Sequence, residues 1–532
     1  MTQSILALLT ALYILVGPWM ADGAFAQKRG GILTMTMIDS PGGLSVLEEA
    51  TYYSTSPMAG VFNNLIMFDQ HAKQNRLETI VPDLATSWSW SSDGLALTMP
   101  LHPGVKWHDG RPFTSKDVLC TWDLLMEKSA DKLRVNPRKA NYRNLERVSA
   151  NGDYEVTFHL KRPQPAFPIL LASGVSVIYP CHVKASEMRT HPVGTGPFKF
   201  VEFKPNEYIK VVRNLDYWKP GRPYLDGVEY KIIRDPATAA LAFMAGTVDM
   251  TFPYQLTVPV YKNIKSQMPG AICELTPDGG VNRHLLINRD TPPFDNPDLR
   301  LAMAMSIDRQ AFVDIVTEGQ GEIGGALQPP PGGMWGMPAS MVKGLPGYDP
   351  DVTKNREQAM GLMRKLGYGP DNRLKIKLLV RDNTFHKTPA ILLIDQLRQV
   401  YIDSELDVVE TPAFYPRLYR KEFTVALNLQ TSGPDPDPTL EAFYGCGSTI
   451  NWDGYCNADV NKMIEQQSME ADQEHRKQMV WAIERKLAED IVRPIIFYSR
   501  QGTCWKPDVK GLTLMENSIF NGNRREDIWL DR

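Results

Sequence analysis

The stretch LHPGVKWHDGRPFTSKDV, residues 101–118, crowds histidines, aspartates and basic residues around Trp107. Taken in isolation, His108 and Asp109 could belong to a catalytic or metal-binding site. The alternative is a structural turn whose polar residues only resemble such a site. The residues on either side of the stretch distinguish these two interpretations.

The flanking sequence favours the turn. Leu95, Leu97, Met99 and Leu101 recur with the two-residue period of a strand, which ends at Leu101. Asp109-Gly110 is a typical turn pair. Thr114 followed by Asp117 has the form of a capping box, so a helix is expected from there to Met126. We therefore expect a strand, a turn with Trp107 packed beneath it, and a helix.

The length and charge of the chain restrict the class of protein. With 532 residues, the chain exceeds the usual size of a single core, so two or more lobes are expected. Its 58 Lys and Arg residues nearly balance 61 Asp and Glu residues, which argues against a nucleic-acid binder. The G-x-S-x-G, P-loop and H-E-x-x-H motifs are absent, so the usual hydrolase and phosphate-binding signals are missing.

The N-terminus is typical of an export signal. Residues 5–16 form an apolar run that is too short to span a bilayer. Ala24-Phe25-Ala26 then supplies the small-x-small pattern of a cleavage site before Gln27. The leading residues MTQS lack Lys and Arg, so an uncleaved anchor is the alternative. We expect a signal peptide at 1–26 and an exported, soluble mature protein.

The cysteines indicate disulfides more than a metal site. They are even in number and scattered, without paired metal-ligand spacing, and an exported protein favours disulfides. Cys446 and Cys456 lie in CGSTINWDGYC, where a short Gly- and Asn-containing loop can bring them together, so they are the preferred pair. The connectivity of the others stays open, and some of them could be small buried hydrophobic residues. These others are Cys120, Cys181, Cys273 and Cys504.

Strand and helix patterns alternate along the chain, which predicts a mixed α/β fold. Two segments rich in proline and glycine, GALQPPPGGMWGMP and TSGPDPDP, are expected to be loops. The expected strands include 34–38, 154–160, 284–288, 374–380, 405–409 and 494–498, and the expected helices include 297–317, 352–366, 388–400 and 458–490.

Among the acidic residues, Asp435 and Asp437 are the pair that most resembles a catalytic or ligand-binding site. Paired carboxylates can hydrolyse glycosides. Prolines at alternate positions make GPDPDP a stiff turn that could instead present polar groups to a ligand. A solvated loop without a ligand is the simplest alternative.

Several long segments together resemble one protein family. They include LATSWSWSSDGLALTMPLHPGVKWHDGRPFTSKDV (84–118), NLDYWKPGRPYLDGVEYKII (214–233) and INRDTPPFDNPDLRLAMAMSIDRQAFVD (287–314). These segments resemble, in order, the family 5 solute-binding proteins of ABC importers, the dipeptide, oligopeptide and nickel type. The resemblance covers essentially the whole mature chain. It implies an α/β, two-lobed periplasmic-binding-protein clamshell (type II, cluster C) that closes on a ligand.

The resemblance also implies how the chain divides. Lobe I would comprise 27–60, 190–272 and 495–532, with an extra subdomain inserted at 61–189. Lobe II would run over 273–494. The stretch that opens at Leu101 falls in the inserted subdomain, which need not contact the ligand.

The resemblance further suggests ligand-binding residues. In dipeptide-binding members an arginine pairs with the ligand carboxylate, and Arg381 falls at that position; a guanidinium suits a carboxylate. An aspartate of a W-x-x-D-x-x-D-P segment pairs with the amino terminus, but Ser432 stands where it is expected. Asp435 or Asp437 could serve instead. The missing acid puts a free peptide ligand in doubt.

Two aromatic residues could stack on a ligand in the cleft: Trp335 in the GGMWG loop and Tyr415 in PAFYPRLY. Burial in the core or at the rim is the alternative for each.

The combined expectation is a periplasmic receptor of an ABC importer that binds peptides or peptide-like solutes by lobe closure. It would act as a monomer that catalyses no reaction and needs no cofactor or metal. Its partners would be a membrane permease and the ATPase of that permease. The same role for an oligosaccharide, an opine or a metal chelate is the first alternative. A secreted hydrolase that uses Asp435 and Asp437 is the second.

Overall fold

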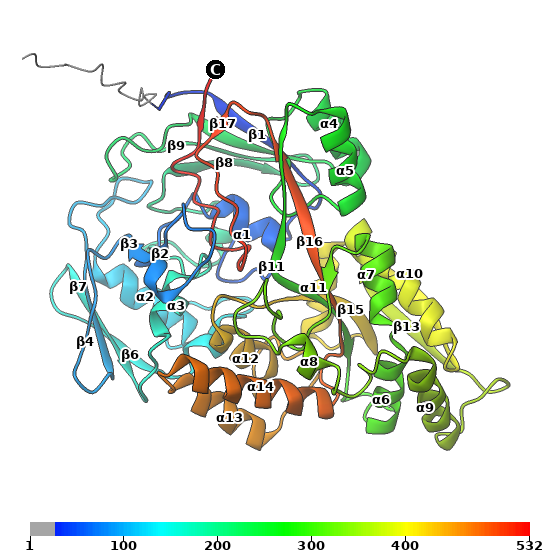
Figure 1. Ribbon diagram of the computed structural model, residues 1–532. Coiled ribbons are helices and arrows are strands. Elements are labelled where there is room, and N and C mark those ends of the chain that lie inside the picture. Colours follow the sequence, from blue (N-terminus) through cyan, green and yellow to red (C-terminus); the bar gives the residue numbers. More distant parts are fainter. Residues whose placement is uncertain (1–26) are drawn as a thin grey trace, which may run out of the picture.

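The computed structural model describes residues 27–532 (Figure 1). The expected signal peptide, 1–26, lies outside the described residues. Three main β-sheets and the helices packed on them form a mixed α/β structure with two lobes. Within residues 27–532, no helix combines the length and the apolar character needed to cross a membrane.

The sheet of the first lobe has the strand order β1-β10-β9-β8. β1 and β10 are parallel, with Met35 opposite Tyr230, and the other pairs are antiparallel. Leu33, Met35 and Met37 are fully buried, as the two-residue period of a strand dictates. The bounds are β1 (Ile32–Met37), β8 (Phe198–Lys204), β9 (Tyr208–Arg213) and β10 (Gly227–Ile232), with helices α1 (Tyr52–Met58), α4 (Pro236–Met244) and α5 (Val258–Gln267) nearby.

A second sheet, of order β4-β5-β7-β6, lies beside the first lobe and contains the strand that leads into the stretch 101–118. Its apolar side chains share one continuous core with the first lobe. Its strands are β4 (Ser89–Trp90), β5 (Ala96–Pro100), β6 (Leu145–Ala150) and β7 (Glu155–Leu160). Around it lie β2 (Ile66–Phe68), β3 (Ile80–Pro82), α2 (Ser115–Leu125), α3 (Phe167–Ala172) and three short 3-10 helices, η1 (Leu77–Thr79), η2 (Lys139–Tyr142) and η3 (Glu187–Arg189).

The turn predicted around Trp107 is confirmed. The amide of Gly110 donates to the carbonyl of Trp107 at 2.8 Å, and Gly110 has φ of +89°, which glycine adopts without strain. Trp107 is buried, and its indole N–H donates to Asp117 at 3.3 Å. Thr114 caps α2 in the predicted capping box.

His108 is part of this structural arrangement and not of a reactive centre. The amide of Gly194 donates to its Nδ1 at 3.3 Å, and its Nε2 lies 3.0 Å from the carbonyl of Gly196. Burial lowers the pKa of His108 to about 4, so the ring is neutral at neutral pH. Both ring nitrogens therefore hold the turn against the chain at 194–196.

The sheet of the second lobe has the order β12-β16-β11-β15-β13-β14 and is mixed. Neighbouring residues of β11 point into different cores, Leu285 and Ile287 into one and Leu286 into the other. A strand buried on both faces has the continuous apolar sequence that the chain shows here. The strands are β11 (Ile272–Ile287), β12 (Gly321–Glu322), β13 (Leu374–Arg381), β14 (Ile402–Val409), β15 (Val425–Thr431) and β16 (Ile495–Trp505).

The helices of the second lobe cover both faces of this sheet. One core contains residues of α6 (Pro297–Ser306), α7 (Arg309–Thr317), α9 (Val352–Lys365) and α10 (Thr384–Arg398). The opposite core contains residues of α11 (Thr411–Tyr419) and α12 (Pro436–Tyr444). The remaining elements are α8 (Ala339–Val342), α13 (Ala458–Ser468), α14 (Gln473–Glu489), β17 (Val509–Lys510) and β18 (Trp529–Leu530).

Two predicted long helices are each divided, so those predictions were wrong. The helix expected at 297–317 breaks at Ile307, whose backbone is extended, and Asp308 caps the next helix by accepting from the amide of Ala311. The helix expected at 458–490 breaks before Asp472, which accepts from the amide of His475. In each case the aspartate accepts a hydrogen bond from a first-turn amide of the new helix. In a continuous helix that amide would donate to a backbone carbonyl of the preceding turn.

Two long strands, β11 and β16, run side by side between the lobes (Figure 1). Ile272 pairs with Trp505 near one end and His284 with Ile495 near the other, with an irregularity between Pro277 and Asn282. A disulfide joins Cys273 of β11 to Cys504 of β16. The lobe boundaries predicted at 272/273 and 494/495 fall at the ends of these strands, and the division itself stays a prediction.

The other two disulfides lie one in each lobe. Cys120 is joined to Cys181 beside the second sheet, and Cys446 is joined to Cys456, the pair that the sequence favoured. No cysteine within the described residues is free.

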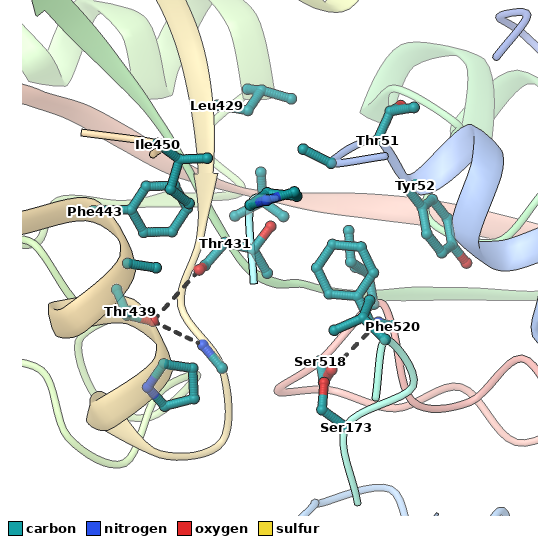
Figure 2. A pocket seen from close by; sticks show the side chains of 18 of the residues that line it. Thr51, Tyr52, Ser173, Leu429, Thr431, Thr439, Phe443, Ile450, Ser518 and Phe520 are labelled. Carbon is teal, nitrogen blue, oxygen red and sulfur yellow. Dashed lines mark hydrogen bonds between the residues drawn. The ribbon is translucent and has the colours of Figure 1, made fainter. Parts of the chain in front are cut away.

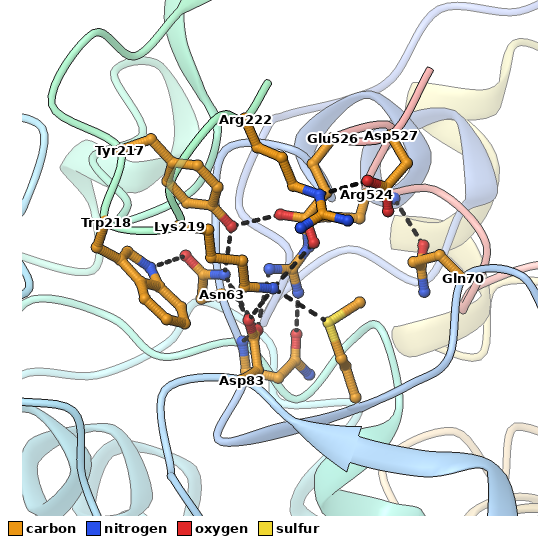
Figure 3. Close-up of polar contacts among 12 residues, drawn as sticks. Asn63, Gln70, Asp83, Tyr217, Trp218, Lys219, Arg222, Arg524, Glu526 and Asp527 are labelled. Atoms are coloured by element: carbon orange, nitrogen blue, oxygen red, sulfur yellow. Dashed lines mark hydrogen bonds and ion pairs between the residues drawn. The ribbon is translucent and has the colours of Figure 1, made fainter. Parts of the chain in front are cut away.

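A buried ion cluster ties the C-terminal segment to the first lobe (Figure 3). Asp83 lies 2.9 Å from Nζ of Lys219 and 3.0 Å from Nη1 of Arg524. Lys219 also contacts Glu526 at 2.9 Å. Two cations and two carboxylates balance each other, so this cluster holds distant parts of the chain together without a net charge.

Candidate functional site

A cavity of about 180 Å³ lies between the two lobes. Figure 2 shows the second-lobe side chains of Leu429, Thr431 and Phe443 on one side and the first-lobe residues Tyr52 and Phe520 on the other. Its lining is predominantly apolar and aromatic with a few polar groups, as in most small-molecule sites. The cavity is therefore the first candidate for a ligand site.

Local structure fixes both walls. On the first-lobe side Thr51 caps α1 by accepting from the amide of Tyr53, and the hydroxyl of Tyr52 donates to Asn523 at 3.0 Å. On the second-lobe side the amide of Gly433 donates to the hydroxyl of Thr439, which orders the chain after β15. Helix caps and side-chain hydrogen bonds of the protein itself thus hold the cavity wall.

Arg381, the last residue of β13, is the most unusual side chain in the lining. It is 3% exposed, and its Nε has no hydrogen-bond partner. One Nη donates to Nε2 of His386, and the rings of Phe414 and Tyr415 lie 5.6 and 5.5 Å from the guanidinium carbon. No carboxylate within the described chain forms an ion pair with it, so the structure holds a buried positive charge without a counter-charge.

Neutral groups connect Arg381 to the other lobe. Burial and the nearby arginines hold the pKa of His386 well below its usual range, so the ring accepts from Arg381 and donates from Nδ1 to Asn383 at 2.6 Å. Asn383 donates to Asp39 of the first lobe at 3.2 Å. The orientation of Arg381 is therefore coupled to a contact between the lobes.

A second guanidinium, that of Arg138, reaches the cavity from the first-lobe side. Its Nη2 donates to the backbone carbonyls of Val46 and Glu49, at 3.4 and 2.6 Å, and its Nε is buried without a partner. Burial lowers the pKa of Arg138, which is the response of a cation whose charge is poorly balanced.

The structure brings two of the six predicted ligand-binding residues into the cavity lining, Arg381 and Tyr415. The other four are not among the described residues that line it. They are Trp335, Ser432, Asp435 and Asp437.

Asp435 and Asp437 form a buried ion cluster with Arg476 of α14, here called the Arg476 cluster. The guanidinium contacts both oxygens of Asp435 at 2.8 Å and Asp437 at 2.9 Å. Asp437 also accepts from Gln164 of the first-lobe side at 2.7 Å. These contacts occupy both carboxylates, and neither residue lines the cavity.

Ser432 and Trp335 make structural contacts close to this cluster. The hydroxyl of Ser432 donates to the carbonyl of Gly280 at 2.8 Å. The indole N–H of Trp335 donates to the carbonyl of Pro434 at 3.0 Å, and its ring lies 4.8 Å from the guanidinium carbon of Arg476. Both residues line a small cavity of about 10 Å³, which has no room for a solute.

A neighbouring cavity of about 380 Å³ shares Ala50 and Tyr415 with the main one. It is larger, but exposed side chains such as Arg134 and Arg420 form part of its lining. Burial raises the pKa of Glu49 there to about 7. Since they share lining residues, the two cavities are adjacent.

Sequence reasoning missed Arg138 and His386. Arg138 lies in the polar segment RVNPRKANY, where a basic residue looks solvated, and no periodicity marks it as buried. His386 follows Arg381 by five residues, and that spacing across the end of a strand and the start of a helix carried no recognisable motif.

Comparison with known sequences identifies relatives over most of the chain. The sequence model of the bacterial extracellular solute-binding proteins, family 5 Middle, matches residues 79–451. Di/tripeptide-binding protein 1 of Pseudomonas aeruginosa (strain UCBPP-PA14) is 26% identical over 465 residues, which are 82% of this chain and 83% of that protein.

Solved structures share the fold. The periplasmic binding protein DppA of Helicobacter pylori, in complex with the peptide STSA, superposes with a TM-score of 0.82 at 22% identity, covering 95% of this chain and 99% of that one. The binding protein AgaA of A. tumefaciens R10, in complex with agropinic acid, gives a TM-score of 0.79 at 23% identity, covering 94% and 99%. At such identities these neighbours establish the architecture.

Proposed function

The chain belongs to the bacterial extracellular solute-binding proteins of family 5, and from this premise we propose that it is a receptor that captures a small carboxylate-bearing solute between its lobes. The observation that carries the proposal is Arg381, a buried guanidinium in the cavity wall without a carboxylate partner. A ligand carboxylate would supply that partner, in the charge-assisted geometry that arginine favours.

Closure of the lobes is the mechanism. Several contacts span the lobes: Asp39 accepts from Asn383 at 3.2 Å, and Gln164 donates to Asp437 at 2.7 Å. Arg162 lies 3.0 Å from Glu465 in a third such contact. A solute that bridges both walls favours the closed state by its differential affinity for that state.

The ligand is peptide-like and small. Relatives of this chain are named for dipeptides and tripeptides, and one structural neighbour was solved with a nonapeptide. The cavity here, about 180 Å³, lies below the range of about 300–1,000 Å³ for drug-sized ligands. A solute of dipeptide size fits this volume better than an oligopeptide does. An opine or another non-peptide acid would use the same arginine.

Asp435 and Asp437 have a structural role in this proposal. Their bonds to Arg476 hold the loop before α12, and Asp437 also joins the lobes through Gln164. A hydrolase would need one of the two as a free nucleophile or acid. Sharing one guanidinium leaves neither free, which supports a receptor that catalyses no reaction.

The family's extracellular role supports export to the periplasm after cleavage of the signal peptide. The receptor, a monomer, would then deliver its solute to a membrane permease driven by an ATPase. Contact with the membrane would be made only through that permease.

Mass spectrometry of the solutes released by denaturing the purified protein tests the proposal. We expect one small carboxylic acid in near-stoichiometric amount. Incubation with chromogenic glycosides and peptides is the complementary assay. Release of no solute together with turnover of one of these substrates would overturn the receptor role.

A further inference from the structure

We propose that the solute carries two carboxylate groups, one held by Arg381 of the second lobe and the other by Arg138 of the first-lobe side. This inference rests on the proposed receptor function and specifies its solute class. The class includes acidic dipeptides and non-peptide dicarboxylates, which share the chemistry that the two guanidiniums recognise.

The two arginines reach the same cavity from opposite walls. Arg381 ends β13 of the second lobe, and Arg138 precedes η2 on the first-lobe side. Each has a buried Nε without a hydrogen-bond partner. Two incompletely bonded guanidiniums that line one cavity are suited to two anionic groups or to one anion between them.

Each arginine is held in place by groups that leave its charge unbalanced. Val46 and Glu49 offer Arg138 their backbone carbonyls, and His386 offers Arg381 a neutral ring. Neither arginine forms an ion pair with a carboxylate of the described residues. These contacts orient the guanidiniums while leaving charge for a ligand to neutralise.

The rest of the described lining offers no competing negative charge. Among the described residues that line the cavity there is no aspartate or glutamate. The carboxylate that interacts electrostatically with Arg138 is that of Glu49, which lines the adjoining cavity and forms an ion pair with Arg134 at 3.3 Å. A solute with a single carboxylate would leave either Arg138 or Arg381 uncompensated in the cavity wall, which is costly.

Buried arginines elsewhere in the protein show the contrast. Arg493 lies 3.3 Å from Asp453, and Arg524 lies 3.0 Å from Asp83, all four side chains being buried. At these two arginines the chain supplies its own carboxylates. Among its described residues it supplies no ion-pair partner at Arg138 or Arg381.

A competition experiment tests the inference. Protein freed of bound solute by reversible unfolding is mixed with equal amounts of Ala-Gln, Ala-Glu, glutarate and N-acetylglutamate, and the retained solutes are measured by mass spectrometry after gel filtration. Ala-Gln and Ala-Glu differ by one carboxylate and little in shape. We expect Ala-Glu to be enriched over Ala-Gln by about tenfold or more, the effect of one charge-assisted pair.

Variants assign this preference to Arg138. The substitution Arg138→Gln should reduce the Ala-Glu to Ala-Gln ratio to near one, and Arg138→Lys should retain part of it. Arg373→Gln is the matched control, because Arg373 pairs with Asp403 at 2.8 Å far from the cavity lining. The ratio is the readout, so a moderate loss of stability does not obscure it, and thermal melting identifies a variant that fails to fold.

Each outcome decides between the hypotheses. Enrichment of Ala-Glu alone supports an acidic peptide, and enrichment of glutarate or N-acetylglutamate supports a non-peptide dicarboxylate. Retention of Ala-Gln by the wild type that equals or exceeds retention of every dicarboxylate in the mixture overturns the inference and leaves the receptor role intact. An Ala-Glu preference that survives in Arg138→Gln also overturns it. Retention of none of the four solutes counts against the proposed function itself.

Discussion

Arg381 and Arg476 are both buried arginines of the second lobe, 3% and 6% exposed, yet their surroundings are opposite. Arg476 contacts two carboxylates, and its Nε donates to Gln467 at 3.0 Å. Arg381 has only a neutral histidine, two aromatic rings and an Nε without a partner. At similar burial, carboxylates of the chain neutralise Arg476, whereas Arg381 keeps a charge that a ligand carboxylate would neutralise.

Removing Arg476 should have the largest effect, and that effect should be on stability. Arg476→Leu leaves Asp435 and Asp437 buried together without a cation, so we expect a loss of about 3–5 kcal/mol in the free energy of unfolding. Urea unfolding measures it. An unchanged midpoint would mean that the Arg476 cluster does not stabilise the fold.

Removing Arg381 should instead affect binding. Arg381→Gln is expected to weaken the binding of Ala-Glu by about 2–5 kcal/mol, the effect of truncating a desolvated charge pair. Stability without solute should stay the same or rise, because a buried unbalanced charge is removed. Calorimetric titration and thermal melting measure the two effects. A variant with a much lower melting temperature and unchanged affinity for Ala-Glu would show that Arg381 is structural and contradict the proposed difference between the two arginines.

Glu484 extends the comparison to a buried carboxyl without a cation. It accepts the amides of Leu327 and Met337, both at 2.8 Å, and burial raises its pKa to about 8. A pKa raised above the unfolded value means that the folded state binds the proton more tightly. The contribution of Glu484 is therefore fully present below about pH 4.5 and is lost as pH rises through about 8.

Urea unfolding between pH 5 and pH 8.5 measures this contribution. The wild type should lose stability with rising pH more steeply than Glu484→Gln, which cannot ionise at this position. Only the difference in slope is compared, since the amide also changes the hydrogen bonds to Leu327 and Met337. Equal slopes would show that Glu484 does not titrate in this range.

The smallest expected effects come from two aromatic residues that the sequence selected. Tyr415→Leu should weaken the binding of Ala-Glu by about 0.5–1 kcal/mol through the lost contact with Arg381. Trp335→Phe should lower stability by about 1 kcal/mol through the lost hydrogen bond to Pro434 and leave affinity unchanged. Calorimetric titration and thermal melting of both variants measure these effects. If Trp335→Phe changed the affinity and Tyr415→Leu did not, Trp335 and not Tyr415 would belong to the ligand site.

Much of the architecture could be predicted from sequence because it is encoded locally. The capping box at Thr114, the turn at Gly110 and the alternation in β1 and β5 each depend on a few neighbouring residues. The breaks at Asp308 and Asp472 were missed because an aspartate within an apolar period is equally compatible with a solvated helix face. Such breaks depend on packing against other elements.

The site was only partly predictable for the same reason. Arg381 was found by its position in a family pattern, and Tyr415 by its type. The carboxylates at 435 and 437 were expected to face a ligand, but their partner, Arg476, lies about 40 residues later in the chain, as the sequence separations of 41 and 39 show. A pairing between segments that distant has no local signal.

A crystal structure of the protein grown with Ala-Glu tests the central claim most directly. We expect a solute carboxylate in the cavity within about 3 Å of the Nε and Nη atoms of Arg381, while Arg476 keeps its contacts with Asp435 and Asp437. A solute bound at the Arg476 cluster, or one in the cavity with no carboxylate on Arg381, would contradict it.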